Sequence, residues 1–531
     1  MLAAVMAGVS GCGSDEEPGP GAAGAGGTVT GAAGGNGAGG LSSAGGGGAG
    51  GAGAPTVTLA VRKGFPDLWG EGADNIRGGS AAGSVKFFVT SVADTDEATF
   101  VPATGSAEAH YEGTLRGALL LEEPRHIIPR VSGNVDLASA ISVSGATRGS
   151  FTYHGHLAPE GGLYVTNDNL VITGLDDFIL RHLRLRFGSA STLSVDDVLS
   201  IGRANQVAVD HCSLAWGADE TFTVQTAVES TYVDIIAQNN ILGQCRDGHN
   251  TGTLIGWTDE GDNAHGEVSW HNNVYVGVTH RTPNFAGDTE MYGRVFNNVA
   301  YDWQHRLTNV VGAPTIDVAY NYYKMGPANP TVPASNYNQY QDLQGSRPYP
   351  PSIFTEGNIM PSVLTDESAD NEVLWSYFGS SDPLPAALFR ATRLPIDGTV
   401  GYEPTTAQAA YERNVVAKEA GANRATDESG NPVIGLDSVD DAYLTAIANG
   451  TDPRTAEASW LHPTVASHDA YPDANWNGIA DPFETAHGID AADEVIPVWD
   501  FGDYVVVNDA GYDAFEIYSA WVAGDFERIV P

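Results

Sequence analysis

The sequence predicts an all-β protein built as a parallel β-helix, because short strand-like runs recur with glycine turns and matching polar residues. Each run ends in a histidine or asparagine at a corresponding position: His182, His211, Asn239, Asn272 and Asn297. Successive members of this series are 25 to 33 residues apart. A repeat of this size is typical of a solenoid, in which each rung exposes a hydrophobic face that only the next rung can cover.

Two other repetitive or all-β folds fit the sequence less well. Leucine-rich repeats need regular leucines at a shorter spacing, and a β-sandwich has strands roughly every 8 to 12 residues without matching asparagine pairs. We expect the asparagines at equivalent turns to form a hydrogen-bonded ladder with a structural role. His211 is expected to be a packed member of the same ladder rather than a metal ligand.

The chain divides by composition into five segments. They are a truncated lipoprotein-like signal (1–12), a Gly/Ala-rich flexible linker (13–55), the β-helix domain (56–345), an extension of loops and short helices packed on it (346–470), and a tail with a calcium-loop pattern (471–531). The extension begins where the repeat disappears, at about Tyr340. Its amphipathic stretches at 407–420 and 438–449 indicate short helices.

The N-terminus resembles a lipoprotein signal. Cys12 closes a Val-Ser-Gly-Cys run after an apolar stretch, although no basic residue precedes that stretch. The alternative is an alanine-rich disordered end. If the signal is genuine, we expect the protein to be exported from the cytoplasm and anchored by a lipid on Cys12. It would then contact a membrane only through that anchor. Cys212 and Cys245 could pair under oxidising conditions, but we expect buried free thiols.

Charge restricts the partners. The 531 residues include 25 Lys and Arg against 66 Asp and Glu, for a formal net charge of -41. Such a surface repels nucleic acid and anionic membranes, which excludes both as main partners. An acidic polymer would be repelled as well, unless a bound cation or local arginines reversed the field at the site.

An acidic constellation lies in the repeat region. It comprises Asp196 and Asp197, and one period later Asp219 and Glu220. Carboxylates one rung apart lie about 4.8 Å from each other along the stacking direction, so Asp197 can converge with Glu220 or Asp219. Hard oxygen ligands of this kind favour Ca²⁺. The alternative is a set of solvated turn aspartates.

Arg281 is a candidate for binding or catalysis, because Pro283 restrains the backbone two residues later and fixes where the guanidinium points. Arginine can bind a carboxylated substrate as a fixed cation. Taken alone, it could equally be a surface arginine.

A more specific motif lies near the C-terminus. Oxygen donors and a glycine follow the pattern of a calcium-binding loop, with Gly478 at position 6 and ligands from Asp473, Asn475, Asn477, Ile479, Asp481 and Glu484. We expect a structural calcium that fixes the C-terminal tail.

Further motifs follow in order from Gly64 to about Trp521. They are G-T-L-R-G-A-L from Gly113, V-S-G from Val131, G-H-L-A-P-E-G-G from Gly155, the strand around Arg181, D-H-C-S from Asp210, Trp216, D-E at Asp219, H-N-T-G-T-L-I-G from His249, the calcium loop, and G-Y-D-A-F-E from Gly511. This ordered series resembles the pectate lyase superfamily, specifically the bacterial branch of polysaccharide lyase family one with a C-terminal calcium loop.

The resemblance implies a right-handed β-helix, monomeric, that cleaves 1,4-linked galacturonan by calcium-dependent β-elimination to 4,5-unsaturated products. Asp197, Asp219 and Glu220 would hold the catalytic calcium, with Asp196 as a further candidate, and Arg281 would take the proton from C5 of the sugar. His249 and Asn284 are assigned to substrate binding. Asn284 stands where the family often carries a second arginine, and the basic residue found near Thr251 in related enzymes is absent.

Two other functions stay open at the level of the sequence. A β-helix hydrolase of the polygalacturonase type would use paired aspartates to activate water and needs no arginine base. A non-catalytic β-helix that binds carbohydrate is the other alternative.

Overall fold

The computed structural model describes residues 54–145, 148–193, 196–225, 232–246, 248–256, 265–342 and 350–529. Residues 55–531 form one compact unit. The expectations for Cys12 and for the linker up to residue 53 lie outside the described residues. Within the described residues, no helix is long and apolar enough to cross a membrane.

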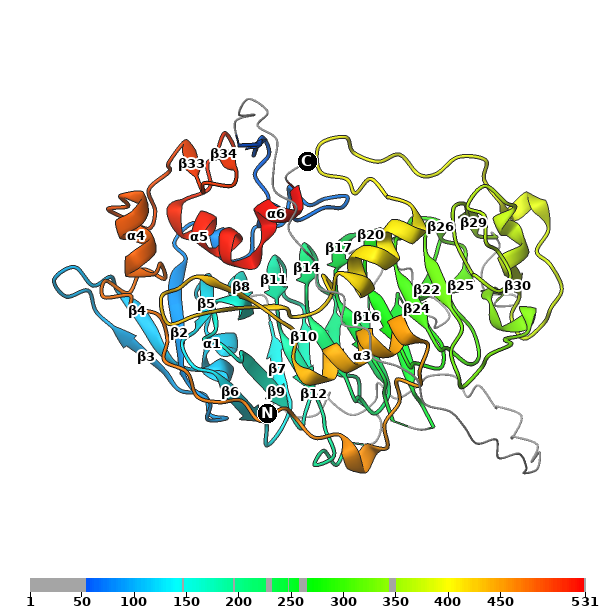
Figure 1. Ribbon diagram of the computed structural model, residues 1–531, viewed down its shortest axis with the longest axis horizontal. Coiled ribbons are helices and arrows are strands. Elements are labelled where there is room, and N and C mark those ends of the chain that lie inside the picture. Colours follow the sequence, from blue (N-terminus) through cyan, green and yellow to red (C-terminus); the bar gives the residue numbers. More distant parts are fainter. Residues whose placement is uncertain are drawn as a thin grey trace, which may run out of the picture. The chain divides into compact units, whose positions relative to one another are not determined.

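Three long sheets make up the body of this unit, and the chain visits them in turn, so that neighbours in each sheet are usually three strands apart in sequence. Nearly all their strand pairs are parallel, the exception being β3 with β4. Figure 1 shows the strands of successive rungs stacked side by side. The predicted parallel β-helix is confirmed.

The first sheet has nine strands: β7 (Ile141–Ser144), β10 (Leu170–Thr173), β13 (Leu199–Gly202), β16 (Glu220–Gln225), β19 (Thr251–Ile255), β22 (Asn284–Gly287), β25 (Asn309–Gly312), β28 (Asn338–Gln341) and β30 (Trp375–Tyr377). The second has eight: β6 (Gly133–Asp136), β9 (Leu163–Thr166), β12 (Arg184–Arg186), β15 (Ser213–Ala215), β18 (Ile241–Gly243), β21 (Val274–Val276), β24 (Val299–Tyr301) and β27 (Tyr322–Lys324).

The third sheet has twelve strands: β3 (Ala98–Val101), β4 (His110–Thr114), β2 (Val85–Ser91), β5 (Arg125–Pro129), β8 (Phe151–His154), β11 (Phe178–Arg181), β14 (Val207–Asp210), β17 (Tyr232–Gln238), β20 (His265–His271), β23 (Met291–Phe296), β26 (Thr315–Ala319) and β29 (Ser352–Phe354). The predicted domain boundary at residue 345 is too early, because β29 and β30 continue the sheets beyond it. Longer insertions between these last strands hide the repeat in the sequence.

The residues that define the repeat occupy one structural position. Each directly follows the last residue of a strand in the twelve-stranded sheet, and all five have a positive φ of 50° to 60°. Asparagine tolerates this left-handed conformation better than most residues, which explains its recurrence there.

The hydrogen-bonded ladder itself is made by the second asparagine of each pair, not by the first as expected. Each of these buried side-chain amides donates to the next at 2.8 to 3.1 Å, in the order Asn240, Asn273, Asn298, Asn321, Asn358 and Asn371. The first asparagine turns the chain, and the second is thereby directed inward, where its amide needs a buried partner.

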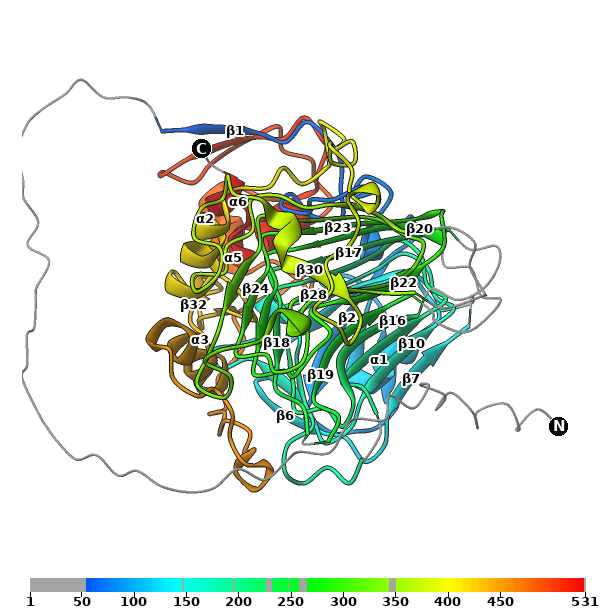
Figure 2. The same cartoon turned by 90° about the vertical axis from the view of Figure 1, so that its right-hand side faces the viewer.

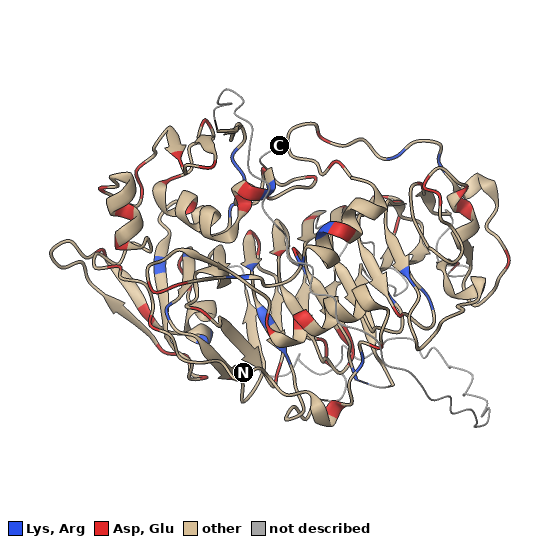
Figure 3. Cartoon of the chain, in the orientation of Figure 1, with Lys and Arg blue, Asp and Glu red and all other residues tan. Residues whose placement is uncertain are grey.

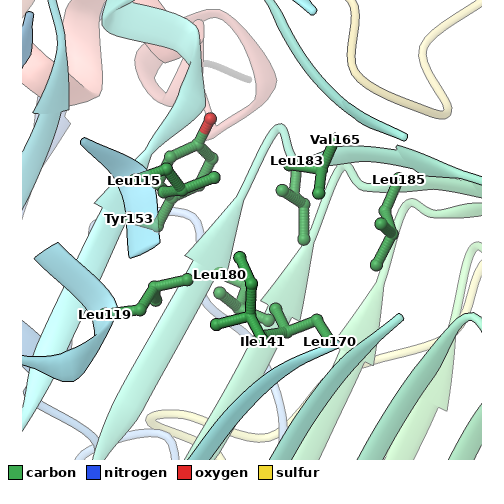
Figure 4. Close-up of a pocket in the computed structure, with 9 residues that line it drawn as sticks. All are labelled: Leu115, Leu119, Ile141, Tyr153, Val165, Leu170, Leu180, Leu183 and Leu185. Carbon is green, nitrogen blue, oxygen red and sulfur yellow. The ribbon is translucent and has the colours of Figure 1, made fainter. Parts of the chain in front are cut away.

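The interior of the solenoid is apolar and closely packed. Its largest hydrophobic cluster collects inward-facing residues from all three sheets. Helix α1 (Leu115–Leu120) covers the N-terminal end of this core with Leu115, Ala118 and Leu119. A small cavity of about 10 Å³ beside α1 is lined by aliphatic side chains and Tyr153 (Figure 4). Such a lining leaves a water molecule without polar partners.

Segments outside the solenoid cover the outer faces of two sheets. Helix α3 (Ser438–Asn449) packs Tyr443, Leu444 and Ile447 on the eight-stranded sheet, beside α2 (Ala407–Tyr411) (Figure 2). The C-terminal segment packs on the first strands of the twelve-stranded sheet. It contains three helices, α4 (Asp481–His487), α5 (Ala514–Ala523) and α6 (Asp525–Ile529). Its strands β33 (Val498–Asp500) and β34 (Val505–Val507) form a three-stranded sheet with β1 (Thr56–Thr58) from the start of the unit, in the order β1-β34-β33. The hairpin of β31 (Arg424–Thr426) and β32 (Pro432–Ile434) lies near α5.

Among the described residues, no apolar cluster packs on the outer face of the nine-stranded sheet. Cys212 and Cys245 are buried free thiols, as expected.

A chain of buried histidines joins α5 to the solenoid. His126 and His154 are linked ring to ring at 3.0 Å, and Ser519 of α5 bridges His154 and His156 at 2.8 and 2.9 Å. Burial, aided by nearby positive charge, lowers the pKa of His126 to about 3, and burial lowers the pKa of His154 and His156 well below the usual value. These imidazoles are therefore neutral in the folded protein.

We predict that the free energy of unfolding falls as the pH drops from about 6.5 towards 3. Unfolded histidines bind protons below about 6.5, whereas the folded ones stay neutral, so acid favours the unfolded chain. His126→Asn should reduce the slope of stability against pH by up to about 1.4 kcal/mol per pH unit in that window, measured by urea unfolding. His468→Gln, at a partly exposed position, is the control. An unchanged slope for His126→Asn would contradict the assignment.

Candidate active site

The acidic constellation forms at the edge of the nine-stranded sheet, where β13 and β16 pair in parallel with Leu199 opposite Phe222. Continuing that register places Asp197, just before β13, beside Glu220, the first residue of β16. The backbone N–H of Glu220 donates to Asp197 Oδ1 at 3.1 Å. One carboxylate oxygen each from Asp197, Asp219 and Glu220 lie within 4.8 Å of one another. The expected convergence of carboxylates on adjacent rungs is present in the structure.

The carboxylates of this cluster repel one another. Burial and the nearby carboxylate of Asp219 raise the pKa of Asp197 to about 7, although a hydrogen bond from Ser200 and the charge of Arg281 act in the opposite direction. Ser200 donates to Asp197 Oδ2 at 3.0 Å. A divalent cation among these oxygens would relieve this repulsion, and an all-oxygen donor set is what Ca²⁺ prefers. The residues present therefore fit such an ion.

Two basic side chains already contact the cluster. Arg281 forms an ion pair with Glu220, and both side chains are almost fully buried. His249 Nδ1 contacts the carboxylate of Asp219, and its side chain is 39% exposed. The structure thus brings together the predicted carboxylates, the predicted arginine and one predicted substrate-binding residue.

Arg281 is held by the backbone of the adjacent rung. Its carbonyl oxygen accepts from the N–H of Thr253 at 2.7 Å, and the preceding residue, His280, bridges to Thr251. Arg281 has a φ of 65°, an uncommon conformation for a residue other than glycine, and the Thr282–Pro283 peptide is cis. Residues held in uncommon backbone conformations cluster at functional sites.

Two predicted site residues lie apart from this group. Asp196 is not among the three converging carboxylates, and its backbone oxygen accepts from the N–H groups of Ala218 and Asp219. Burial, Asp168 and Asp219 raise the pKa of its side chain. Asn284 is buried in β22, and its side-chain oxygen accepts from Asn309 at 2.7 Å.

Acidic residues are spread over the whole unit (Figure 3), so acidity alone does not mark the site. The site is distinguished by carboxylates that converge and by the basic groups that contact them. Sequence reasoning missed two groups here. Asp168 acts on Asp196 from a neighbouring rung. His280 and His305 lie next to each other with ring centroids 5.8 Å apart.

The C-terminal loop motif is folded as a compact turn that enters α4. Asp473 accepts backbone N–H groups from Asn477 and Gly478, both at 3.0 Å. The side-chain amides of Asn475 and Asn477 reach Glu484 at 3.1 and 2.6 Å. The side chains at loop positions 3 and 5 therefore both contact the carboxylate at position 12, and the side chain at position 1 holds the backbone of the turn. Asp481 begins α4, and Ile479 is buried.

A glycine is required at the sixth loop position. Gly478 has a φ of 87°, and a Cβ there would come within 2.7 Å of Phe515 and 2.9 Å of Ile128. The loop is also tied to the solenoid, because Trp476 stacks on His110 with centroids 4.6 Å apart.

Known proteins resemble this chain over part of its length. Probable pectate lyase C of Aspergillus terreus is 29% identical over 233 residues, which cover 43% of this chain and 51% of that protein. Its counterpart in Neosartorya fischeri is 29% identical over 286 residues, 52% and 59% of the two chains. That of Aspergillus fumigatus is 30% identical over 220 residues, 41% and 47%. The chain is similar to pectate lyases.

This similarity supports the predicted superfamily, while the bacterial branch stays a prediction because these relatives are fungal. The chain spans about half the length of the curated relatives it matches. No protein-family model matches it.

Solved structures with a similar fold include two bacterial pectate lyases. That of Bacillus sp. N165 in complex with trigalacturonate is 14% identical with a TM-score of 0.41, over 65% of this chain and 95% of that one. Pectate lyase C of Erwinia chrysanthemi is 14% identical with a TM-score of 0.39, over 65% and 94%.

We predict that Asp197→Asn removes one bound Ca²⁺ per chain while raising the melting temperature in the presence of a chelator. Neutralising one of three crowded carboxylates relieves repulsion, and an amide is a poorer calcium ligand than a carboxylate. Calorimetric titration gives the stoichiometry. Asp196→Asn is the matched control and should keep the wild-type number of ions. A full complement of calcium in Asp197→Asn would refute the site.

Proposed function

We propose that the protein is a pectate lyase-type enzyme that cleaves 1,4-linked galacturonan by calcium-dependent β-elimination. The observation that carries this proposal is the contact of Arg281 with a group of three carboxylates on adjacent rungs. The sequence similarity to probable pectate lyases supports the reaction class.

In the proposed reaction, the C5–H bond of a uronate breaks, its electron pair forms the C4=C5 double bond, and the bond from C4 to the glycosidic oxygen breaks. The departing oxygen takes a proton from solvent. Asp197, Asp219 and Glu220 would hold Ca²⁺, which withdraws electron density from the substrate carboxylate and makes the C5 hydrogen more acidic. In a protein with a net charge of -41, this cation also makes binding of an acidic polymer possible.

Two roles for Arg281 fit its position. It could accept the C5 proton after a transient loss of its own, which is demanding because arginine side chains are charged at all ordinary pH values. It could also stabilise the negative charge that develops on the uronate as the proton leaves. In both roles Glu220 positions the guanidinium, and His249 lies beside the same cluster, where a substrate could contact it.

The substrate is a polymer too large to cross a membrane, so we propose that the enzyme works outside the cytoplasm, as a monomer. The lipid anchor at Cys12 is part of the same proposal. A polygalacturonase-type hydrolase is the alternative that shares the substrate, and the product distinguishes the two.

We predict that polygalacturonate with Ca²⁺ gives a rise in ultraviolet absorbance from the conjugated unsaturated product, and that a chelator abolishes the rise. Arg281→Lys and Arg281→Ala should both lower kcat by about 10²- to 10⁴-fold. The lysine variant keeps a positive charge beside Glu220, whereas the alanine variant does not. Arg393→Ala, in an exposed ion pair with Glu403, is the control. New reducing ends without absorbance would favour the hydrolase, and full activity of Arg281→Ala would refute its role.

We further propose that the loop at residues 473–484 binds a structural Ca²⁺ through Asp473, Asn475, Asn477, the backbone carbonyl of Ile479, Asp481 and Glu484. The donor pattern and the turn around Gly478 support this assignment.

Glu484→Gln is expected to lose one Ca²⁺ and to lower the melting temperature in calcium, because position 12 supplies a bidentate carboxylate. Activity at low temperature should persist, since Asp197 and its neighbours are untouched. Glu494→Gln, at an exposed position, is the control. Equal calcium stoichiometry in the wild type and Glu484→Gln would exclude the loop as a metal site.

A further inference from the structure

Two buried histidines occupy the left-handed position that asparagine occupies in later rungs of the twelve-stranded sheet. His182 follows β11 and His211 follows β14, whereas the next three rungs carry Asn239, Asn272 and Asn297 at this position. Strands β11 and β14 pair in parallel, so the two imidazoles lie on adjacent rungs, with ring centroids 5.0 Å apart. Both side chains are completely buried. Two imidazoles therefore lie side by side in the interior of the protein.

These imidazoles differ from the asparagines in having ring nitrogens without hydrogen-bond partners. Among the described residues, neither nitrogen of His182 has a partner, and Nε2 of His211 has none either. By contrast, the side chain of Asn239 donates to Asp210 and accepts from Arg413, both at 3.1 Å. Leaving a buried polar group unpaired is costly, so three such nitrogens on two neighbouring rings indicate a bound species.

Asp210 completes a set of three potential metal ligands. One nitrogen from each histidine and one carboxylate oxygen of Asp210 lie within 4.8 Å of one another. Asp210 Oδ1 contacts Nδ1 of His211 at 2.7 Å and accepts from Gln238 at 3.0 Å. A carboxylate on Nδ1 leaves the lone pair on Nε2, the usual arrangement of a metal-binding histidine. Asp210 Oδ2 accepts from Arg181 at 3.0 Å and, as a carboxylate oxygen, has a second lone pair for an ion.

Binding an ion requires a modest movement of the rings. Around a tetrahedral ion with metal–nitrogen bonds of about 2.0 to 2.1 Å, neighbouring ligand atoms lie about 3.4 Å apart. The two imidazole planes are nearly parallel, at 11°, so at least one ring must turn about its Cβ–Cγ bond to direct a nitrogen at the same ion. No hydrogen bond to a described residue holds the ring of His182, so this ring can turn.

The charges next to this group of ligands are paired. Helix α6 lies over these strands (Figure 1), and its Asp525 accepts from Arg181 at 2.6 Å and from Arg528 at 2.9 Å. Arg528 also donates to Asp67 at 2.5 Å. Because carboxylates compensate both guanidiniums, they oppose a cation less than free charges would. The helix also closes the group off from solvent, as is typical of structural rather than catalytic metal sites.

We propose that His182, His211 and Asp210 bind a structural Zn²⁺ between the twelve-stranded sheet and α6. Imidazole nitrogens suit zinc, whereas calcium prefers ligands that are all oxygen, so this site differs in chemistry from the carboxylates around Asp197 and from the loop at residues 473–484. The ion links two adjacent rungs directly. His211 is then a metal ligand and not only a packed residue, as the sequence suggested.

The metal content of the purified protein tests the proposal. The full chain, produced in medium with zinc and purified in Ca²⁺ without chelator, should carry one zinc ion per chain by elemental mass spectrometry. His182→Asn and His211→Asn should lose this ion while keeping the turn, because asparagine occupies the same left-handed position in later rungs. His126→Asn, which removes a buried histidine paired with His154, is the matched control and should keep it. Asp197→Asn should also keep it.

Thermal stability gives a second readout. Removing zinc by unfolding and refolding with a chelator, followed by return of Ca²⁺ alone, should lower the melting temperature of the wild type. The same treatment should leave the melting temperature of His182→Asn unchanged, because that variant has no zinc to lose. Returning zinc during refolding should restore the wild-type value only in chains that keep both histidines.

The outcomes decide the matter. A wild type without zinc, or equal zinc in the wild type, His182→Asn and His211→Asn, would overturn the proposal and leave ordered water as the partner of these nitrogens. Loss of zinc from Asp197→Asn but not from the histidine variants would place the ion at the candidate active site and also overturn it. Loss from a folded His126→Asn would do the same, because the loss would then not report the proposed ligands. The proposed lyase function stands or falls separately.

Discussion

Parallel pairing between rungs is the constraint on which the rest of the structure depends. It brings residues about one repeat apart in sequence into contact, as in the hydrogen bond from the backbone N–H of Glu220 to the carboxylate of Asp197, 23 residues earlier. The same pairing stacks the asparagine ladder and carries Arg281 to Glu220 across two rungs. Because each rung fixes the next, a side chain at the sheet edge has little freedom to move away from its neighbours.

The three-sheet solenoid determines both which faces the extension and the C-terminal tail cover and where the candidate active site lies. The outer faces of two sheets carry apolar side chains, such as Ile241 and Phe88, which are unfavourable when exposed to water as a large patch. The extension and the C-terminal tail cover the eight-stranded and twelve-stranded sheets, with Tyr443 on one and Phe515 on the other. The site develops at the edge of the remaining sheet, where Arg281 and His249 contact carboxylates that would otherwise repel one another.

The repeat spacing in the sequence predicted the features that arise from contacts between neighbouring rungs. The five equivalent residues share one backbone conformation, and Asp197, Asp219 and Glu220 converge, because both follow from a spacing visible in the chain. The sequence could not show which asparagine of each pair points inward, since this depends on the φ of the first. Nor could it show that Ser519 bridges His154, 365 residues away, because no repeat links the tail to the solenoid.

The most direct test of this account is a crystal structure of the Arg281→Lys variant with Ca²⁺ and trigalacturonate, in which anomalous scattering locates the ion. The account predicts a cation held by Asp197, Asp219 and Glu220, with a uronate carboxylate on that cation and the C5 hydrogen facing residue 281. A cation bound only in the loop at residues 473–484, or a sugar bound away from the edge of the nine-stranded sheet, would contradict it.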